Sequence, residues 1–179
     1  MQVATTPQKL SKSDALNIAI KKGGFLGKLI VKQEMTSLDL IYFPYYLIEF
    51  KYTVKPISIF RTKKSNINKP KESKINILCD CTTGVAALAD SLPNFEVKEV
   101  EDKSIKDKLI NDDELLKRSK KLAFKLIHKH NVGHPYLESW EIKEIYRPFW
   151  VAIYGKFEQG NKIRYLPIQA DGHNIQRTF

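Results

Sequence analysis

The alternation of apolar and polar residues predicts two helices and several strands. Apolar side chains recur at helical spacing over residues 112–131, and acidic residues stand at the start of that segment. Ser11 with Asp14 predicts the start of an earlier helix, and the glycine-rich segment 23–27 is typical of a helix end. Residues 46–54 alternate apolar with polar side chains, which predicts a strand with one apolar face.

Two segments with aromatic residues around a proline are similar to each other. The first is residues 41–48 (IYFPYYLI) and the second is residues 145–152 (IYRPFWVA), so Ile, Tyr and Pro match at an offset of 104. A predicted helix precedes each segment, and a predicted strand with a glycine turn follows each, at 75–84 and 163–172. Each proline lacks a backbone donor, so we expect it at a strand start or a bulge.

This duplication predicts an α+β fold of two similar units, residues 1–104 and residues 105–179. Each unit is expected to pack one helix on a roughly three-stranded antiparallel sheet, since a sheet with one apolar face needs a cover. The helix of the same unit is the expected cover. The hairpin loop is predicted to be short in the second unit, near 159–162, and long in the first, over 61–74. We expect the two units to pack together and share a core.

Three features resemble the PepSY family of small bacterial domains. They are a helix start, a tyrosine-rich strand over residues 42–52 and a closing Asp-x-x-Thr-Gly at 80–84; the helix start comprises Ser11, Asp14, Ala15, Leu16 and Ala19. The second unit departs from the family pattern, because Ile168 stands where Asp80 would fall and only Asp171-Gly172 preserves the turn. The resemblance implies a non-catalytic module that binds or inhibits other proteins, often outside the cytoplasm.

The aromatic residues around the two prolines are the candidates for partner binding. Most of them are expected in the core, because aromatic side chains dominate core burial. Both faces of residues 41–47 are apolar, so a face that no helix covers must meet the other unit, a second subunit or a ligand. The contact between units is the first expectation and a homodimer is the next. The partner-binding set comprises Tyr42, Tyr45, Tyr46, Phe149 and Trp150.

The charge of the chain suggests a second kind of partner. The 179 residues include 30 Lys and Arg against 20 Asp and Glu, a formal net charge of +10. Half of this excess lies in the polar segment 61–74, a predicted loop. A flexible basic loop binds polyanions weakly, so nucleic acid is the alternative partner, although a solvated loop is the simpler interpretation. The anion-binding candidates are Arg61, Lys63, Lys64, Lys69, Lys71 and Lys74.

Motifs for catalysis or metal binding are scarce. Cys79 and Cys81 share one face of a predicted strand, and the four histidines do not follow zinc-finger spacing, so buried packing is favoured over a zinc site. His128 and His130 are expected in the last turns of the second helix, where a cation suits the helix dipole. The chain lacks a nucleophile elbow and a phosphate-binding loop, so it indicates no enzyme, cofactor or metal.

The ends of the chain and its apolar runs bear on localisation. No run approaches the ~18 apolar residues that a membrane-spanning helix needs, and residues 1–12 lack the apolar core of a signal peptide. Together with only two cysteines, this predicts a cytoplasmic protein, or an extracytoplasmic one if a leader or anchor is missing. The predicted function is a non-catalytic interaction or regulatory module that binds a protein or peptide.

Overall fold

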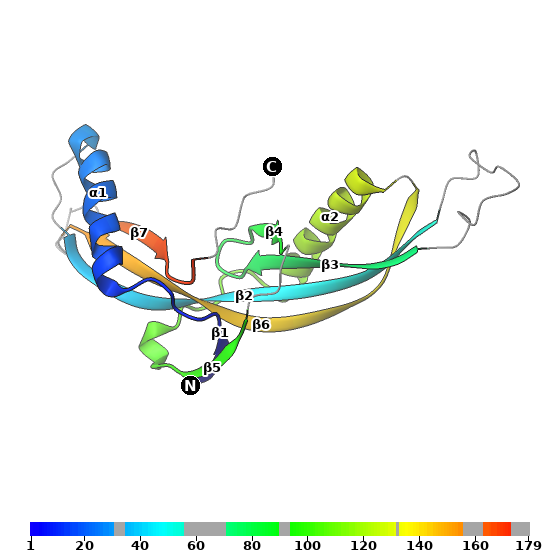
Figure 1. Ribbon diagram of the computed structural model, residues 1–179, viewed down its shortest axis with the longest axis horizontal. Helices are drawn as coiled ribbons and strands as arrows, with labels where there is room; N and C mark the ends of the chain where they lie inside the picture. Colours follow the sequence, from blue (N-terminus) through cyan, green and yellow to red (C-terminus); the bar gives the residue numbers. More distant parts are fainter. Residues whose placement is uncertain (31–34, 56–70, 90–93, 132, 156–162, 173–179) are drawn as a thin grey trace, which may run out of the picture. The chain divides into compact units, whose positions relative to one another are not determined.

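The computed structural model describes residues 1–179 except 31–34, 56–70, 90–93, 132, 156–162 and 173–179 (Figure 1). Within these described ranges it contains two helices of 19 residues and a short 3₁₀ helix at Asp102–Ser104. The helices are α1 (Lys12–Ile30) and α2 (Asp112–His130). The strands are β1 (Gln2–Thr5), β2 (Met35–Lys55), β3 (Lys71–Asp80), β4 (Ala86–Leu88), β5 (Glu96–Glu99), β6 (His134–Tyr154) and β7 (Arg164–Gln169).

The strands form one seven-stranded sheet in the order β4-β3-β2-β6-β1-β5, with β7 also paired to β6. The prediction of two duplicated units, each with its own three-stranded sheet, is therefore wrong. The reason is the length of β2 and β6, which are 21 residues each and continue past their prolines. Each is long enough to pair with several shorter strands along its course. The α+β class itself is confirmed.

Of the two settings expected for Pro44, a strand start or a bulge, the strand start is wrong, because Pro44 lies inside β2. The partner of β2 changes at this position. Before the proline, the carbonyl oxygen of Tyr42 accepts a hydrogen bond from the Lys106 amide at 2.9 Å. After it, the antiparallel ladder with β3 begins at Tyr45. The proline nitrogen cannot donate a hydrogen bond, but it falls between the two partners of β2, so the strand continues through the proline.

Pro148 lies inside β6 in a similar setting. The carbonyl oxygen of Tyr146 accepts a hydrogen bond from the Thr6 amide at 3.2 Å, and the ladder with β7 begins at Phe149. Both prolines are fully buried. A proline that falls where the neighbouring strand changes therefore does not end the strand that contains it.

The chain divides into two compact units, and each combines segments that are distant in sequence. Unit 1 comprises Met1–Pro44, Pro93–Asp107 and Tyr146–Asn174, and unit 2 comprises Tyr45–Leu92, Lys108–Ile145 and Ile175–Phe179. In unit 1, Ala15 and Ala19 of α1 pack against buried residues of three strands: Leu38 of β2, Trp150 and Ala152 of β6, and Ile168 of β7.

In unit 2, α2 packs on strands that precede it in the sequence. Leu115, Ala123 and Leu126 of α2 share a core with Tyr46, Ile48 and Phe50 of β2 and with Ile77 and Cys79 of β3. The expectation that each helix covers the sheet of its own predicted unit is therefore wrong. The segment before each helix explains this exchange, because its backbone bonds to the end of a strand in the other predicted unit. Leu10 N donates to Ala170 O in unit 1, and Ile110 N donates to Cys81 O in unit 2.

The first and last residues of the helices test the helix ends that were predicted from the sequence. α2 is confirmed: Asn111 caps it by accepting a hydrogen bond from Glu114 N at 2.8 Å, and His128 and His130 lie in its last turn. The predicted end of the first helix at residues 23–27 is wrong, since α1 continues to Ile30. A glycine inside a helix costs only about 1 kcal/mol, so glycines alone do not end one.

Neither helix in the described part of the chain has the length and apolar character to cross a membrane.

Candidate functional site

The structure buries every member of the predicted partner-binding set, each being less than a tenth exposed. Trp150 donates a hydrogen bond from Nε1 to Leu10 O at 3.0 Å, and the Phe149 ring meets Phe43 edge-on with centroids 5.1 Å apart. The set comprises Tyr42, Tyr45, Tyr46, Phe149 and Trp150. These side chains form cores within the units, and their role in partner binding stays a prediction.

Tyr46 also joins a polar network in unit 2. Its hydroxyl donates to Asp112 Oδ1 at 2.7 Å and accepts from Lys108 Nζ at 2.9 Å, while Lys108 reaches Glu144 at 2.7 Å. Burial raises the pKa of the Tyr46 hydroxyl, so it stays protonated and can donate. The network ties the segment before α2 to two strands, which is a structural role.

The first half of β6 is the longest open strand edge among the described residues. Residues 134–145 have β2 on one side and no described strand on the other, because β1 meets β6 only at Tyr146 and β7 begins at Phe149. The other open stretches in the described part of the chain are shorter, including 35–41 of β2 and 71–75 of β3. Natural sheets usually keep open edges short, so this stretch stands out as an interaction site.

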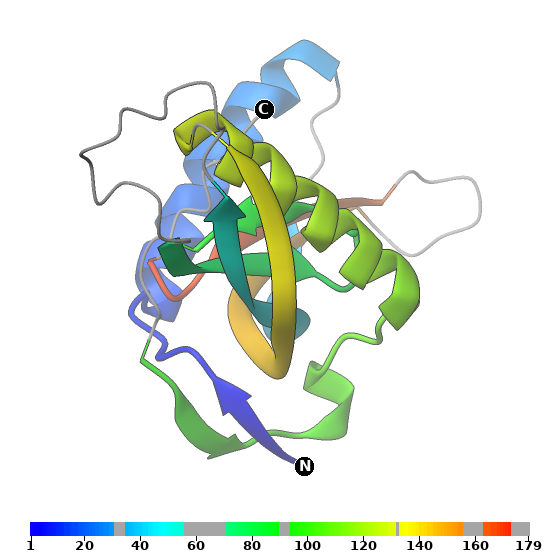
Figure 2. The ribbon, with the colours of Figure 1, turned by 90° about the vertical axis from the view of Figure 1, so that its right-hand side faces the viewer.

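Side chains on this edge are exposed on both faces of the strand. All residues from 138 to 144 are exposed, and Trp140 and Ile142 are 42% and 45% accessible. Alternate residues of a strand share a face, so Tyr136 lies on the same face as these two. Lys120 of α2 places its Nζ 3.4 Å from the centre of the Trp140 ring, so α2 borders this face. Figure 2 shows the first half of β6 in front, with α2 beside it.

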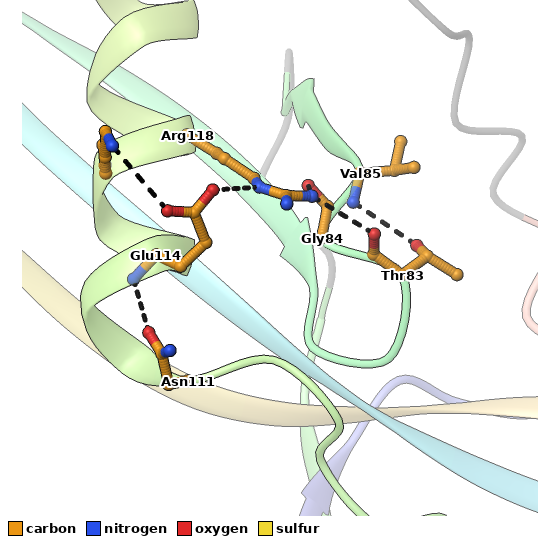
Figure 3. A network of polar contacts seen from close by, with 7 residues as sticks. Thr83, Gly84, Val85, Asn111, Glu114 and Arg118 are labelled. Carbon is orange, nitrogen blue, oxygen red and sulfur yellow. Dashed lines mark hydrogen bonds and ion pairs between the residues drawn. The ribbon is translucent and has the colours of Figure 1, made fainter.

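The closing motif at residues 80–84 forms a self-contained turn. Asp80 Oδ1 accepts hydrogen bonds from the amides of Thr82 and Thr83, at 2.7 and 3.2 Å, and Gly84 has a φ of 72°. Asp80 therefore acts as a turn residue that bonds to the backbone of its own turn. Arg118 of α2 reaches the carbonyl oxygens of Thr83 and Gly84 at 3.4 and 3.5 Å (Figure 3). The turn thus holds the start of α2 in place.

Sequence reasoning missed a buried ion pair in unit 1. Arg147 donates from Nε to Asp171 Oδ2 at 2.7 Å and from Nη2 to Oδ1 at 2.9 Å, and both side chains are at most 1% exposed. Thr6 Oγ1 also donates to Asp171 at 3.0 Å. The available signal was an arginine inside the aromatic run 145–152, since a buried arginine requires an anionic partner. The pair links β6 to the end of β7 and to the segment before α1.

The two cysteines are free thiols in the core of unit 2 and are fully buried. Burial raises the pKa of Cys81 to about 12, and it also raises the pKa of Cys79. Both thiols are therefore protonated near neutral pH, which makes them poor nucleophiles and poor metal ligands. Within the described ranges, no three His, Cys, Asp or Glu side chains gather as a metal site.

Most of the predicted anion-binding loop lies outside the described residues, including Arg61, Lys63, Lys64 and Lys69. The predicted end of the loop at residue 74 is wrong, since β3 begins at Lys71 and contains both Lys71 and Lys74. Lys74 is part of β3 and pairs with Glu49 across the strands at 2.7 Å. The predicted short hairpin loop at 159–162 also lies outside the described residues.

Comparison of the chain with protein-family models, with curated proteins and with solved structures gave no match. The resemblance to the PepSY family therefore stays a prediction. The function is argued from the sites above.

Proposed function

We propose that this chain is a non-catalytic interaction module that binds a protein or peptide as an added β-strand on the open edge of β6. The observation that carries the proposal is the exposed stretch 138–142 on the longest open edge among the described residues. An open edge offers a row of backbone N–H and C=O groups, and an extended peptide pairs with such a row without any particular sequence.

Side chains at this edge supply selectivity. Trp140 and Ile142 project from the same face of the strand, so a bound strand is expected to place apolar side chains opposite them. Glu138 and Glu141 are also exposed, and they place one negative charge on each face of the β6 strand. Charged residues discourage uncontrolled pairing between sheet edges, which keeps the site available for a specific partner.

The other candidate residues support a non-catalytic role. Asp80 is occupied by its own turn, and Asp171 is held by Arg147 and Thr6. Cys79 and Cys81 are buried and protonated. Each of these groups already has a structural use, whereas residues 134–145 of β6 have no described strand on the side away from β2.

The test is a selection of random peptides from a display library on the immobilised full chain, followed by measurement of their affinities. Selected peptides are expected to slow amide hydrogen exchange at residues 138–142. Trp140→Ala is expected to weaken binding about tenfold, the effect of losing a side chain worth about 1.4 kcal/mol. Tyr165→Ala is the matched control, because Tyr165 is an exposed aromatic residue on β7.

Three results would count against strand addition at this edge. They are the recovery of no binding peptide, equal weakening by the two variants, and protection from exchange at another strand. Sedimentation of the free chain shows whether it is a monomer or a homodimer. A dimer that protects residues 138–142 would show that the edge binds a second copy of the chain.

A further inference from the structure

The outer face of α2 carries four lysines, each one helical turn after the previous one. Lys117, Lys121, Lys125 and Lys129 are all exposed. Residues four apart lie on one face of a helix, about 6 Å from each other along its axis. The buried residues of α2 lie on the opposite face, so the lysine row points away from the core of unit 2; they are Leu115, Ser119, Ala123, Leu126 and Ile127.

Only the first lysine of this row, Lys117, forms an ion pair among the described residues. Glu114 is the last acidic residue of α2, and it lies 4.0 Å from Lys117 and 2.8 Å from Arg118. None of the ion pairs formed among the described residues involves Lys121, Lys125 or Lys129. Like charges four residues apart destabilise a helix, so an anion bound along the row would relieve this repulsion.

We infer that the outer face of α2 binds the phosphate backbone of a nucleic acid. A row of exposed cations on a chain of net charge +10 is the electrostatic footprint of phosphate binding. A helix that binds a membrane inserts its apolar face into the lipid, but the apolar face of α2 is packed in the core of unit 2. The outer face offers lysines instead, which favours a nucleic acid over a lipid surface.

The row is suited to the backbone rather than to the bases. Lysine is a point charge without the forked geometry that reads a guanine edge. Arg118, which has that geometry, is already engaged by Glu114 and by the carbonyl oxygens of Thr83 and Gly84. Binding is therefore independent of nucleotide sequence and sensitive to salt. This site is separate from the edge of β6, because it uses side chains of α2 only.

The test measures affinity of the full chain for a short random-sequence DNA duplex by fluorescence anisotropy, between about 50 and 200 mM salt. The variant replaces Lys121, Lys125 and Lys129 with glutamine. It is expected to weaken binding about tenfold or more at low salt, and to reduce the slope of log affinity against log salt by about 0.9 per lysine.

The matched control replaces Lys12, Lys21 and Lys22 of α1 with glutamine. These lysines are also exposed and helical, and their loss changes the net charge by the same amount. The control is expected to keep nearly all of the affinity and of the salt slope. Circular dichroism of both variants verifies that the helices are intact.

No duplex binding at the lowest salt would overturn the inference, as would equal weakening by the two variants. Vesicles that contain phosphatidylserine provide the competing arm. Vesicle binding that depends on the α2 lysines, without binding of the duplex, would assign the row to a membrane surface and would also overturn the inference.

Discussion

Units 1 and 2 differ in whether charged side chains are buried in their interiors. Unit 1 buries an ion pair between Arg147 and Asp171 at the end of its hairpin. Unit 2 has a core cluster of apolar side chains and exposes its lysines on the outer face of α2. The outward face of α1 differs again, since Ile20 is 59% exposed. A unit built from a helix packed on paired strands can therefore use charged residues either to link elements in its interior or to form an exposed surface.

The glycine turns of the two units sharpen this comparison. Gly84 and Gly172 both have a φ of 72°, and an aspartate stands near each. Asp80 bonds within its own turn, whereas Asp171 bonds to residues 24 and 165 positions away. The same residue type therefore acts locally in unit 2 and over long range in unit 1. The difference lies in the partner that the fold supplies, which for Asp171 is a buried arginine.

The largest expected effect is the loss of the buried ion pair. Arg147→Ala leaves the Asp171 carboxylate buried without its cation, which is expected to lower the free energy of unfolding by about 3–5 kcal/mol. Arg118→Ala is the control, because its ion pair with Glu114 is exposed at the surface of unit 2 and is worth about 1 kcal/mol or less. Urea denaturation of both variants measures the difference. Equal losses would contradict the contrast between a buried charge in unit 1 and exposed charges in unit 2.

A smaller effect is expected from the buried thiol of Cys81. Its folded pKa of about 12 lies above the usual value of 9.0, so the folded protein retains the proton that the unfolded chain loses. The free energy of unfolding is therefore expected to fall as pH rises from about 9 toward 12. Cys81→Ala should show a weaker fall, as measured by denaturation across this range. A parallel pH dependence in both proteins would show that other groups, including Tyr46, account for the fall.

The smallest expected effect compares the starts of the two helices. Asn111 caps α2 by accepting from Glu114 N at 2.8 Å, and Ser11 accepts from Asp14 N at 3.1 Å before α1. Replacing either residue with alanine is expected to cost about 1 kcal/mol in the free energy of unfolding. Thermal or urea denaturation tests whether the two losses agree. A much larger loss at Asn111 would indicate that unit 2 depends more strongly on its helix than unit 1 does.

Prediction from the sequence succeeded where structure depends on neighbouring residues. The apolar stripe of α2, the acidic residues at its start and the glycine turn after β3 all rest on contacts within a few positions. The edge of β6 was missed, although residues 138–144 carry charged side chains on both strand faces, which is a signal of exposure. Arg147 was missed as a core residue because its partner is 24 positions away.

The sequence by itself determined where α2, the later part of β2, β3 and β7 lie, because periodicity and turn residues act over a few positions. Only the tertiary structure decided that seven strands form one sheet and that β2 and β6 continue through their prolines. It also decided that α1 packs on β6 and β7, and that α2 packs on β2 and β3. These outcomes depend on which distant backbone groups and apolar faces meet, and local periodicity does not encode that choice.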